Sequence, residues 1–141
     1  MTRWETRKFL NGYKRAVARM RQARANIEKL RTAAESTTTQ LTGMPGGGQI
    51  GDKVGSGAAR IADAEAQFRQ MELDAIETMA EIVRVIDLVE NTTQAEVLHR
   101  YHIEMQQLTK IADDMHYSPR WIDEMHRRGI DAVAKILNSA L

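Results

Sequence analysis

The chain has 141 residues, 43% of them apolar, so it can bury a core but is short for two independent globular domains. It contains no cysteine, which excludes disulfides, thiolate zinc sites and thiol nucleophiles. The net charge of +1 hides a segregation, since residues 1–35 carry +7, residues 58–93 carry −5 and residues 94–141 carry −1. A basic segment beside an acidic one suggests that the two pair with each other.

The chain shows no sign of membrane insertion or export. No apolar run approaches the roughly 20 residues of a membrane span, and residues 1–14 lack the apolar core of a signal peptide. We therefore expect a soluble, cytoplasmic protein with no membrane partner.

Two long helices are predicted in the first two thirds of the chain, because apolar residues recur there on heptad lines. The first helix covers residues 6–34 and the second covers residues 61–89. The first seam consists of Phe9, Tyr13, Ala16, Met20, Ala23, Ile27, Leu30 and Ala34. The second consists of Ile61, Ala64, Phe68, Met71, Ala75, Thr78, Ile82, Val85 and Val89.

An antiparallel hairpin pairs every seam position when the two residue numbers add to 98, so that Ala34 meets Ala64 and Leu30 meets Phe68. The same register brings Arg31 near Glu65 and Arg24 near Glu72. The alternative is that the seams join different chains, in a homodimer or tetramer. Two helices bury little, so a second subunit could also be needed to cover the hairpin.

Residues 36–57 are predicted to form a linker between the two helices. They contain seven glycines and Pro45, a composition that disfavours a helix. A phosphate-binding loop does not fit, because Asp52 separates Gly51 from Lys53 and no hydroxyl residue follows. The predicted domains are therefore a helical hairpin over 1–91, with this linker, and a second domain over 92–141.

The second domain reads as a helix-turn-helix preceded by a short amphipathic helix. Thr92 or Thr93 is predicted to cap that first helix, and Thr93 with Glu96 has capping-box spacing. The small residue Ala112 stands where the two helices of the unit must cross closely. Ser118 is placed to cap the second helix and Pro119 to begin it. The inward set is Leu108, Ile111, Ala112, Met115, Ile122 and Met125, and the last helix continues it through Ile130, Val133, Ile136 and Leu137.

Two stretches of the chain carry a resemblance to known proteins. The run from Val97 to Tyr101, then Leu108 to Ala112, Tyr117 to Ile122 and Arg127 to Ile130 resembles region 4 of bacterial sigma factors. The stretch 43–48 (GMPGGG) followed by 52–55 (DKVG) resembles the linker of a phage and prophage family of small proteins, similar to the ArpU-type late transcription regulators. The resemblance implies an all-α, DNA-binding regulator of phage late gene expression in a bacterial host cytoplasm.

In sigma region 4 the recognition helix presents Arg, Glu, Arg and Gln to the promoter, at what would be Pro119, Arg120, Asp123 and Glu124 here. Asp123 and Glu124 are acidic, and a carboxylate can accept from the amino group of cytosine. The predicted DNA contacts are Arg100, Lys110, Ser118, Arg120, Trp121, Arg127 and Arg128. A solvated helix face is the alternative for Arg127 and Arg128, and hydrophobic packing is the alternative for Trp121.

Neither a metal site nor a catalytic site emerges from the residue pattern. Glu96, His99 and His102 lie one helical turn apart, but two exposed histidines at this spacing usually hold no ion, so no metal or other cofactor is predicted. No nucleophile, base and orienting acid can be assembled at recognisable spacing, and we expect no enzyme.

The leading interpretation is a transcription regulator whose partner is double-stranded DNA. The competing hypothesis is an interaction module that does not bind DNA and instead docks on RNA polymerase or another phage protein. The charge of −1 over residues 94–141 favours the second hypothesis.

Overall fold

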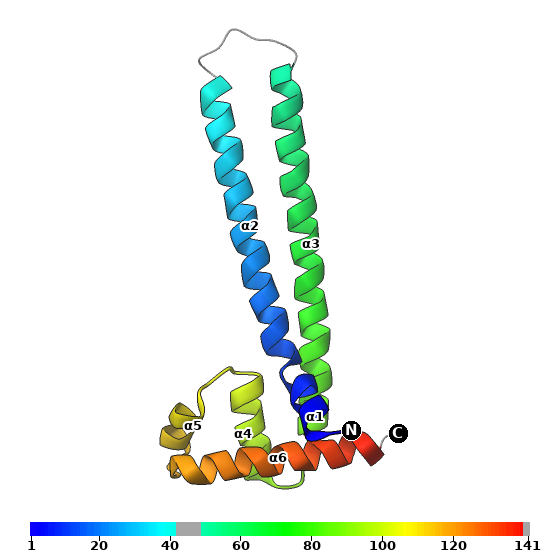
Figure 1. Ribbon diagram of the computed structural model, residues 1–141, viewed down its shortest axis with the longest axis vertical. Coiled ribbons are helices and arrows are strands. Elements are labelled where there is room, and N and C mark those ends of the chain that lie inside the picture. The colour runs from blue at the N-terminus through cyan, green and yellow to red at the C-terminus, as the bar shows by residue number, and fades with distance from the viewer. Residues whose placement is uncertain (42–48, 140–141) are drawn as a thin grey trace. The chain divides into compact units, whose positions relative to one another are not determined.

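The computed structural model describes the backbone of residues 1–41 and 49–139, and the side chains of 1–36 and 55–139 (Figure 1). Helices are the only regular elements in these ranges, so the all-α prediction is confirmed. They are α1 (Arg3–Leu10), α2 (Gly12–Leu41), α3 (Gln49–Ile86), α4 (Thr92–His102), α5 (Leu108–Met115) and α6 (Pro119–Ser139). None of these described helices is both long and apolar enough to cross a membrane.

The chain divides into two compact units, each described separately below. The α2/α3 unit is Val17–Asp74, and the terminal unit joins Met1–Ala16 to the chain from Ala75 onwards. This division differs from the predicted boundary after residue 91. The physical reason is that Leu10 and the end of α3 share one apolar core with α4 and α6, so both ends of the hairpin belong to the terminal unit.

The first predicted helix is interrupted, which the heptad pattern did not indicate. Thr2 caps α1, since its Oγ1 accepts from the Glu5 N–H at 3.1 Å and the Glu5 carboxylate accepts from the Thr2 N–H at 2.7 Å. The backbone hydrogen bond from Thr2 lowers the pKa of Glu5. The helix then breaks at Asn11, whose side chain is held by His102 of α4.

The predicted linker over 36–57 is too long. Helix α2 continues to Leu41 and α3 begins at Gln49, while residues 42–48 lie outside the described part of the chain. Glycine in a helix costs about 1 kcal/mol relative to alanine, which is a penalty and not a prohibition. Extending an existing helix is also far easier than nucleating one.

Within the α2/α3 unit the two helices run antiparallel, but one heptad away from the predicted register. The Cβ of Ala34 lies 4.0 Å from the position that a Cβ on Gly57 would occupy, and these numbers add to 91. The guanidinium of Arg24 lies 5.3 Å from the centre of the Phe68 ring and not beside Glu72. Arg31 does pair with Glu65, as predicted, because two long side chains can meet across a helical turn.

This register can be tested with engineered cysteines, since the chain has none of its own. We expect the pair Ala34→Cys and Gly57→Cys to form a disulfide within one chain, because the 4.0 Å Cβ separation suits a disulfide. The matched pair Ala34→Cys and Ala64→Cys, which belongs to the register of 98, should stay reduced. Non-reducing electrophoresis and intact mass at low protein concentration measure both, and the opposite pattern would restore the predicted register.

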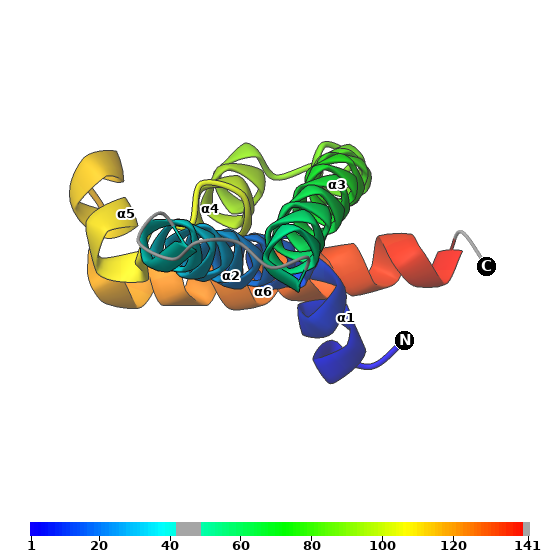
Figure 2. The same ribbon diagram turned by 90° about the horizontal axis from the view of Figure 1, so that it is seen from above.

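The terminal unit is built along α6, which passes α5, α4 and α1 in turn (Figures 1 and 2). Arg3 of α1 forms two 3.0 Å hydrogen bonds with Asp131 near the C-terminal end of α6. Gly129 lets α6 approach α4 closely, because a Cβ there would lie 3.0 Å from two carbons of Leu98. The main core cluster consists of Leu10, Ile82, Ile86, Val89, Leu98, Ile103, Ile130 and Val133.

The cap predicted for α4 is wrong by one or two residues. Asn91 has extended backbone angles and its side chain accepts from the Gln94 N–H at 3.0 Å, so α4 begins at Thr92. Asparagine is among the strongest N-caps, and Asn91 comes first along the chain. The threonines are therefore already inside the helix.

Helices α5 and α6 follow the predicted pattern closely. His116 has φ 61° and ψ 39° and ends α5 in the left-handed region, and the Tyr117 N–H donates to the carbonyl of Ala112 at 3.0 Å. Ser118 then caps α6 and Pro119 begins it. The predicted inward residues from Leu108 to Met125 belong to one apolar cluster, in which Ile111, Ala112 and Ile122 are fully buried. Those from Ile130 to Leu137 belong to the main core cluster or pack against it.

Candidate functional site

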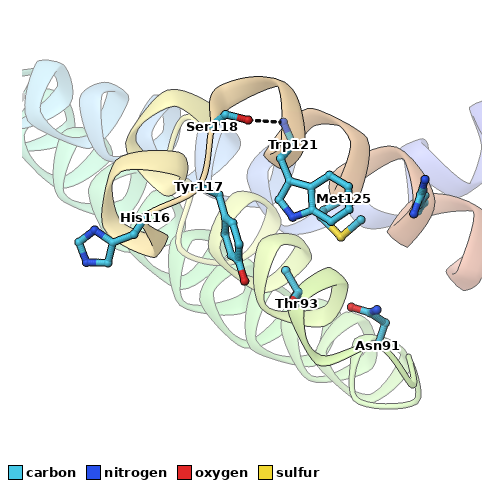
Figure 3. A pocket seen from close by; sticks show the side chains of 8 residues that line it. Asn91, Thr93, His116, Tyr117, Ser118, Trp121 and Met125 are labelled. Atoms are coloured by element: carbon cyan, nitrogen blue, oxygen red, sulfur yellow. Dashed lines mark hydrogen bonds between the residues drawn. The ribbon is translucent and has the colours of Figure 1, made fainter.

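A hollow lies beside the turn that joins α5 to α6 in the terminal unit (Figure 3). It has a volume of about 590 Å³ and lies between the N-terminal ends of α4 and α6. Its lining is Asn91, Thr93, His116, Tyr117, Ser118, Trp121, Met125 and Arg128. We call this the α4/α6 hollow.

Two aromatic side chains dominate the exposed part of this site. Tyr117 is 43% exposed and Trp121 is 40% exposed. The backbone N–H of Trp121 donates to Ser118 Oγ at 3.1 Å, so the cap itself sets where the indole leaves the helix. Figure 3 shows both rings beside the hollow, with Thr93 and Asn91 of α4 across from them.

The arginines of α6 differ in how they are paired. Arg127 lies 3.6 Å from Asp123 and 2.8 Å from Glu124, and Arg128 lies 3.0 Å from the second oxygen of Glu124. The guanidinium of Arg128 also sits 5.7 Å from the centre of the Trp121 ring. By contrast, Arg120 is exposed and no carboxylate in the described part of the chain lies within ion-pairing distance.

Arg100 and Lys110 lie away from the hollow and share a carboxylate. Arg100 is 3.0 Å from Glu96 and 3.8 Å from Asp114, and Lys110 is 4.0 Å from the same Asp114. The seven predicted residues therefore lie in three places. Ser118, Trp121 and Arg128 line the hollow, Arg120 and Arg127 lie along the same helix, and Arg100 and Lys110 lie on α4 and α5.

The buried centre of the terminal unit contains a polar network that the residue pattern did not reveal. His102 Nδ1 lies 3.0 Å from Asn11 Oδ1, and His102 Nε2 lies 3.0 Å from His126 Nε2. The network is satisfied when Nδ1–H of His102 donates to Asn11 and Nε2–H of His126 donates to His102. Each ring is then neutral and all of its contacts are matched.

Burial is the main reason why both imidazoles stay neutral. It lowers the pKa of His102 to about 3 and that of His126 to about 4. The cations of Arg7 and Lys14 add to the effect on both rings, and the His126 ring adds to the effect on His102. Lys14 is itself half-buried and stacks on the Tyr101 ring, and burial lowers its pKa too. His102 thus faces inward while His99 lies 3.7 Å from Glu104, so the suggested Glu96, His99 and His102 set does not converge.

Sequence reasoning missed Asn91, Thr93, His116, Tyr117 and Met125 as part of the site. Tyr117 could have been found, because an aromatic residue directly before an N-cap lies at an exposed turn. Asn91 and Thr93 could not, since they reach the hollow only through the packing of α4 on α6. No protein-family model, curated protein or solved structure matches the chain.

Proposed function

We propose that this protein binds double-stranded DNA through α5 and α6, acting as a helix-turn-helix transcription regulator without catalytic activity. One observation carries the proposal: α5 and α6 share an apolar cluster that contains the fully buried Ala112, the chain turns at His116, and most residues in the first turn of α6 are exposed. This is the arrangement in which a second helix can enter a major groove. The resemblance to the ArpU-type family and to sigma region 4 supports the regulatory role.

The N-terminal end of α6 offers the contacts that such docking needs. Arg120 forms no ion pair with any residue that the structure describes and can donate to guanine or phosphate, while Trp121 and Tyr117 can lie against sugars or base edges. The N-terminal amide groups and the helix dipole add a favourable field for a phosphate. In this proposal Arg120 is the central DNA contact.

The carboxylates beside Arg127 and Arg128 do not preclude this role. Exposed ion pairs are worth only about 0.2 to 1 kcal/mol each, so a guanidinium can exchange a carboxylate for a phosphate. The same carboxylates lower affinity for DNA in general, because a polyanion repels them. They therefore favour a regulator with weak non-specific binding.

In this proposal the coiled-coil-like hairpin of α2 and α3 has a structural role, and α5 and α6 make the DNA contacts. Ion pairs such as Arg31 with Glu65 contribute more to register than to stability, and apolar contacts along the heptad lines hold the two helices together. RNA polymerase is a further partner that the sigma-like resemblance suggests.

Fluorescence anisotropy with duplex DNA at several salt concentrations tests the proposal. Arg120→Ala should weaken binding and lower the log–log salt slope by about 0.9 if it removes one phosphate contact. Asp123→Asn should strengthen non-specific binding, because it removes a repelling carboxylate. Lys135→Ala, an exposed cation near the other end of α6, is the matched control and should change neither quantity.

The same data distinguish the competing hypothesis, a protein-docking module. The composition of the α4/α6 hollow favours it, since Trp, Tyr and Arg are the residues most enriched at binding hot spots. If the wild-type protein binds no duplex even at low salt, DNA binding is rejected. Trp121→Ala and Tyr117→Ala would then be the variants to test for lost binding to RNA polymerase.

A further inference from the structure

The apolar seam of the α2/α3 unit is only partly covered. Among its described side chains, Ile27 is the one apolar residue that is fully buried, with 6% of its surface exposed. Leu30, Phe68 and Met71 are only partly buried although they occupy seam positions. Two helices alone rarely bury enough apolar surface to be stable, so this unit lacks a covering element of its own.

A groove runs along one side of the seam. It has a volume of about 370 Å³ and is lined by Arg19, Gln22, Ala23, Asn26 and Leu30 of α2 and by Ala64, Gln67 and Met71 of α3. The small residues Ala23 and Ala64 leave space for an incoming side chain. The amides of Gln22 and Gln67 can both donate and accept, so each can pair with the other in a second molecule.

The two rims of this groove carry opposite charges. On α2, Arg19 lines the groove, and Lys29 lies one turn beyond the lining residue Asn26. On α3, Asp63 lies one turn before Gln67, and Asp74 lies one turn after Met71. All four charged residues are exposed, and no ion pair joins them to another described residue. Arg60, one turn before the lining residue Ala64, also lies along α3, so the groove is basic along α2 and only net acidic along α3.

We propose that the groove of the α2/α3 unit binds a second copy of the same chain, forming a four-helix bundle. The two-fold axis runs parallel to the helices, so α2 of one copy packs antiparallel on α3 of the other. Residues at equal height have numbers that add to about 91, as Ala34 and Gly57 do. Lys29 then lies at the height of Asp63 of the partner subunit, and Arg19 at that of Asp74 of the partner subunit.

Charge selects this arrangement over its main alternative. A two-fold axis perpendicular to the helices would place α2 against α2 and α3 against α3. The described part of α2 within the unit, residues 17–36, carries five Lys or Arg and two Asp or Glu, and residues 55–74 of α3 carry two and four. Like charges would then face each other along both helix pairs, which is unfavourable. A single helix from another protein, whether basic or acidic, would be complementary in charge to only one rim of the groove.

Charge reversal with rescue tests the proposal on the full chain. Sedimentation equilibrium should show a dimer whose Kd rises about tenfold in Lys29→Glu, because attraction becomes repulsion at two symmetric places. Asp63→Lys should have the same effect. The double variant with both changes should regain the wild-type Kd, a result that a loss of folding could not produce.

A pair of alanine variants locates the interface. Ala64→Glu places a charge in the groove and should raise the Kd at least a hundredfold, whereas Ala62→Glu, on an exposed part of α3, should leave it unchanged. Circular dichroism of both variants checks that the helices persist. If Ala64→Glu unfolds, the test rests on the Kd of the double variant, Lys29→Glu with Asp63→Lys. A chain that stays monomeric at all concentrations, or a dimer indifferent to Lys29→Glu, would overturn the proposal whether or not the protein binds DNA.

Discussion

Acidification from pH 7 to pH 4 should unfold the terminal unit, because His102 and His126 must both be neutral in the native state. Their exposed fractions are 1% and 8%, and their Nε2 atoms lie 3.0 Å apart. Protonating both rings would place two N–H donors against each other and two cations beside Arg7 and Lys14. Only the carboxylate of Asp123 acts in the opposite direction, on His126.

The sign and the pH range follow from the two lowered pKa values. An unfolded histidine titrates near pH 6.5, whereas the folded rings have pKa values of about 3 and about 4. Between these limits the unfolded state binds more protons, so the stabilisation is complete above pH 6.5 and is lost as the pH falls. Each imidazole contributes a slope of about 1.4 kcal/mol per pH unit in this range.

Urea unfolding at pH 7, 6, 5 and 4 measures this slope. His126→Gln keeps a donor for His102 Nε2 but removes one titrating ring. The dependence of the unfolding free energy on pH should therefore fall by about 1.4 kcal/mol per pH unit, the contribution of one proton. Equal stability at pH 7 and pH 4 would contradict the neutral pair.

Ala112→Leu should destabilise the terminal unit by about 1 to 3 kcal/mol, because it overpacks a close helix contact. Ala112 is fully buried in the cluster that joins α5 to α6, and its carbonyl accepts the Tyr117 N–H that ends α5. Three added carbons must displace Ile111, Ile122 or Met125, all of which are themselves buried. The expected fall in Tm is about 4 to 8 °C for each kcal/mol.

Differential scanning calorimetry compares this variant with Ala62→Leu, which adds the same atoms at an exposed position of α3. Only the first should lose stability. DNA affinity should fall in parallel if α6 is the docking helix, since its position depends on this contact. An unchanged Tm for Ala112→Leu would mean that α5 and α6 do not cross there.

The residue pattern was most informative where a structure depends on nearby residues. Ser118, Pro119 and Ala112 determined the turn and the start of α6, because capping and close crossing act over a few residues. Helix content and the heptad lines of α2 and α3 followed from periodicity in the same way. The seven predicted DNA contacts rest on charge and position along the chain, which do not indicate how these residues are grouped in space.

The composition and periodicity of the chain by themselves determined its all-helical character, the seams and the local structure of α5 and α6. Only the tertiary structure decided the heptad register, because a seam that repeats every seven residues matches itself almost equally well one heptad away. The break at Asn11 and the pairing of His102 with His126 likewise depend on residues 91 and 24 positions apart in the chain. Such contacts produce no periodic pattern in the sequence, because they stabilise the fold only when packing buries both partners together.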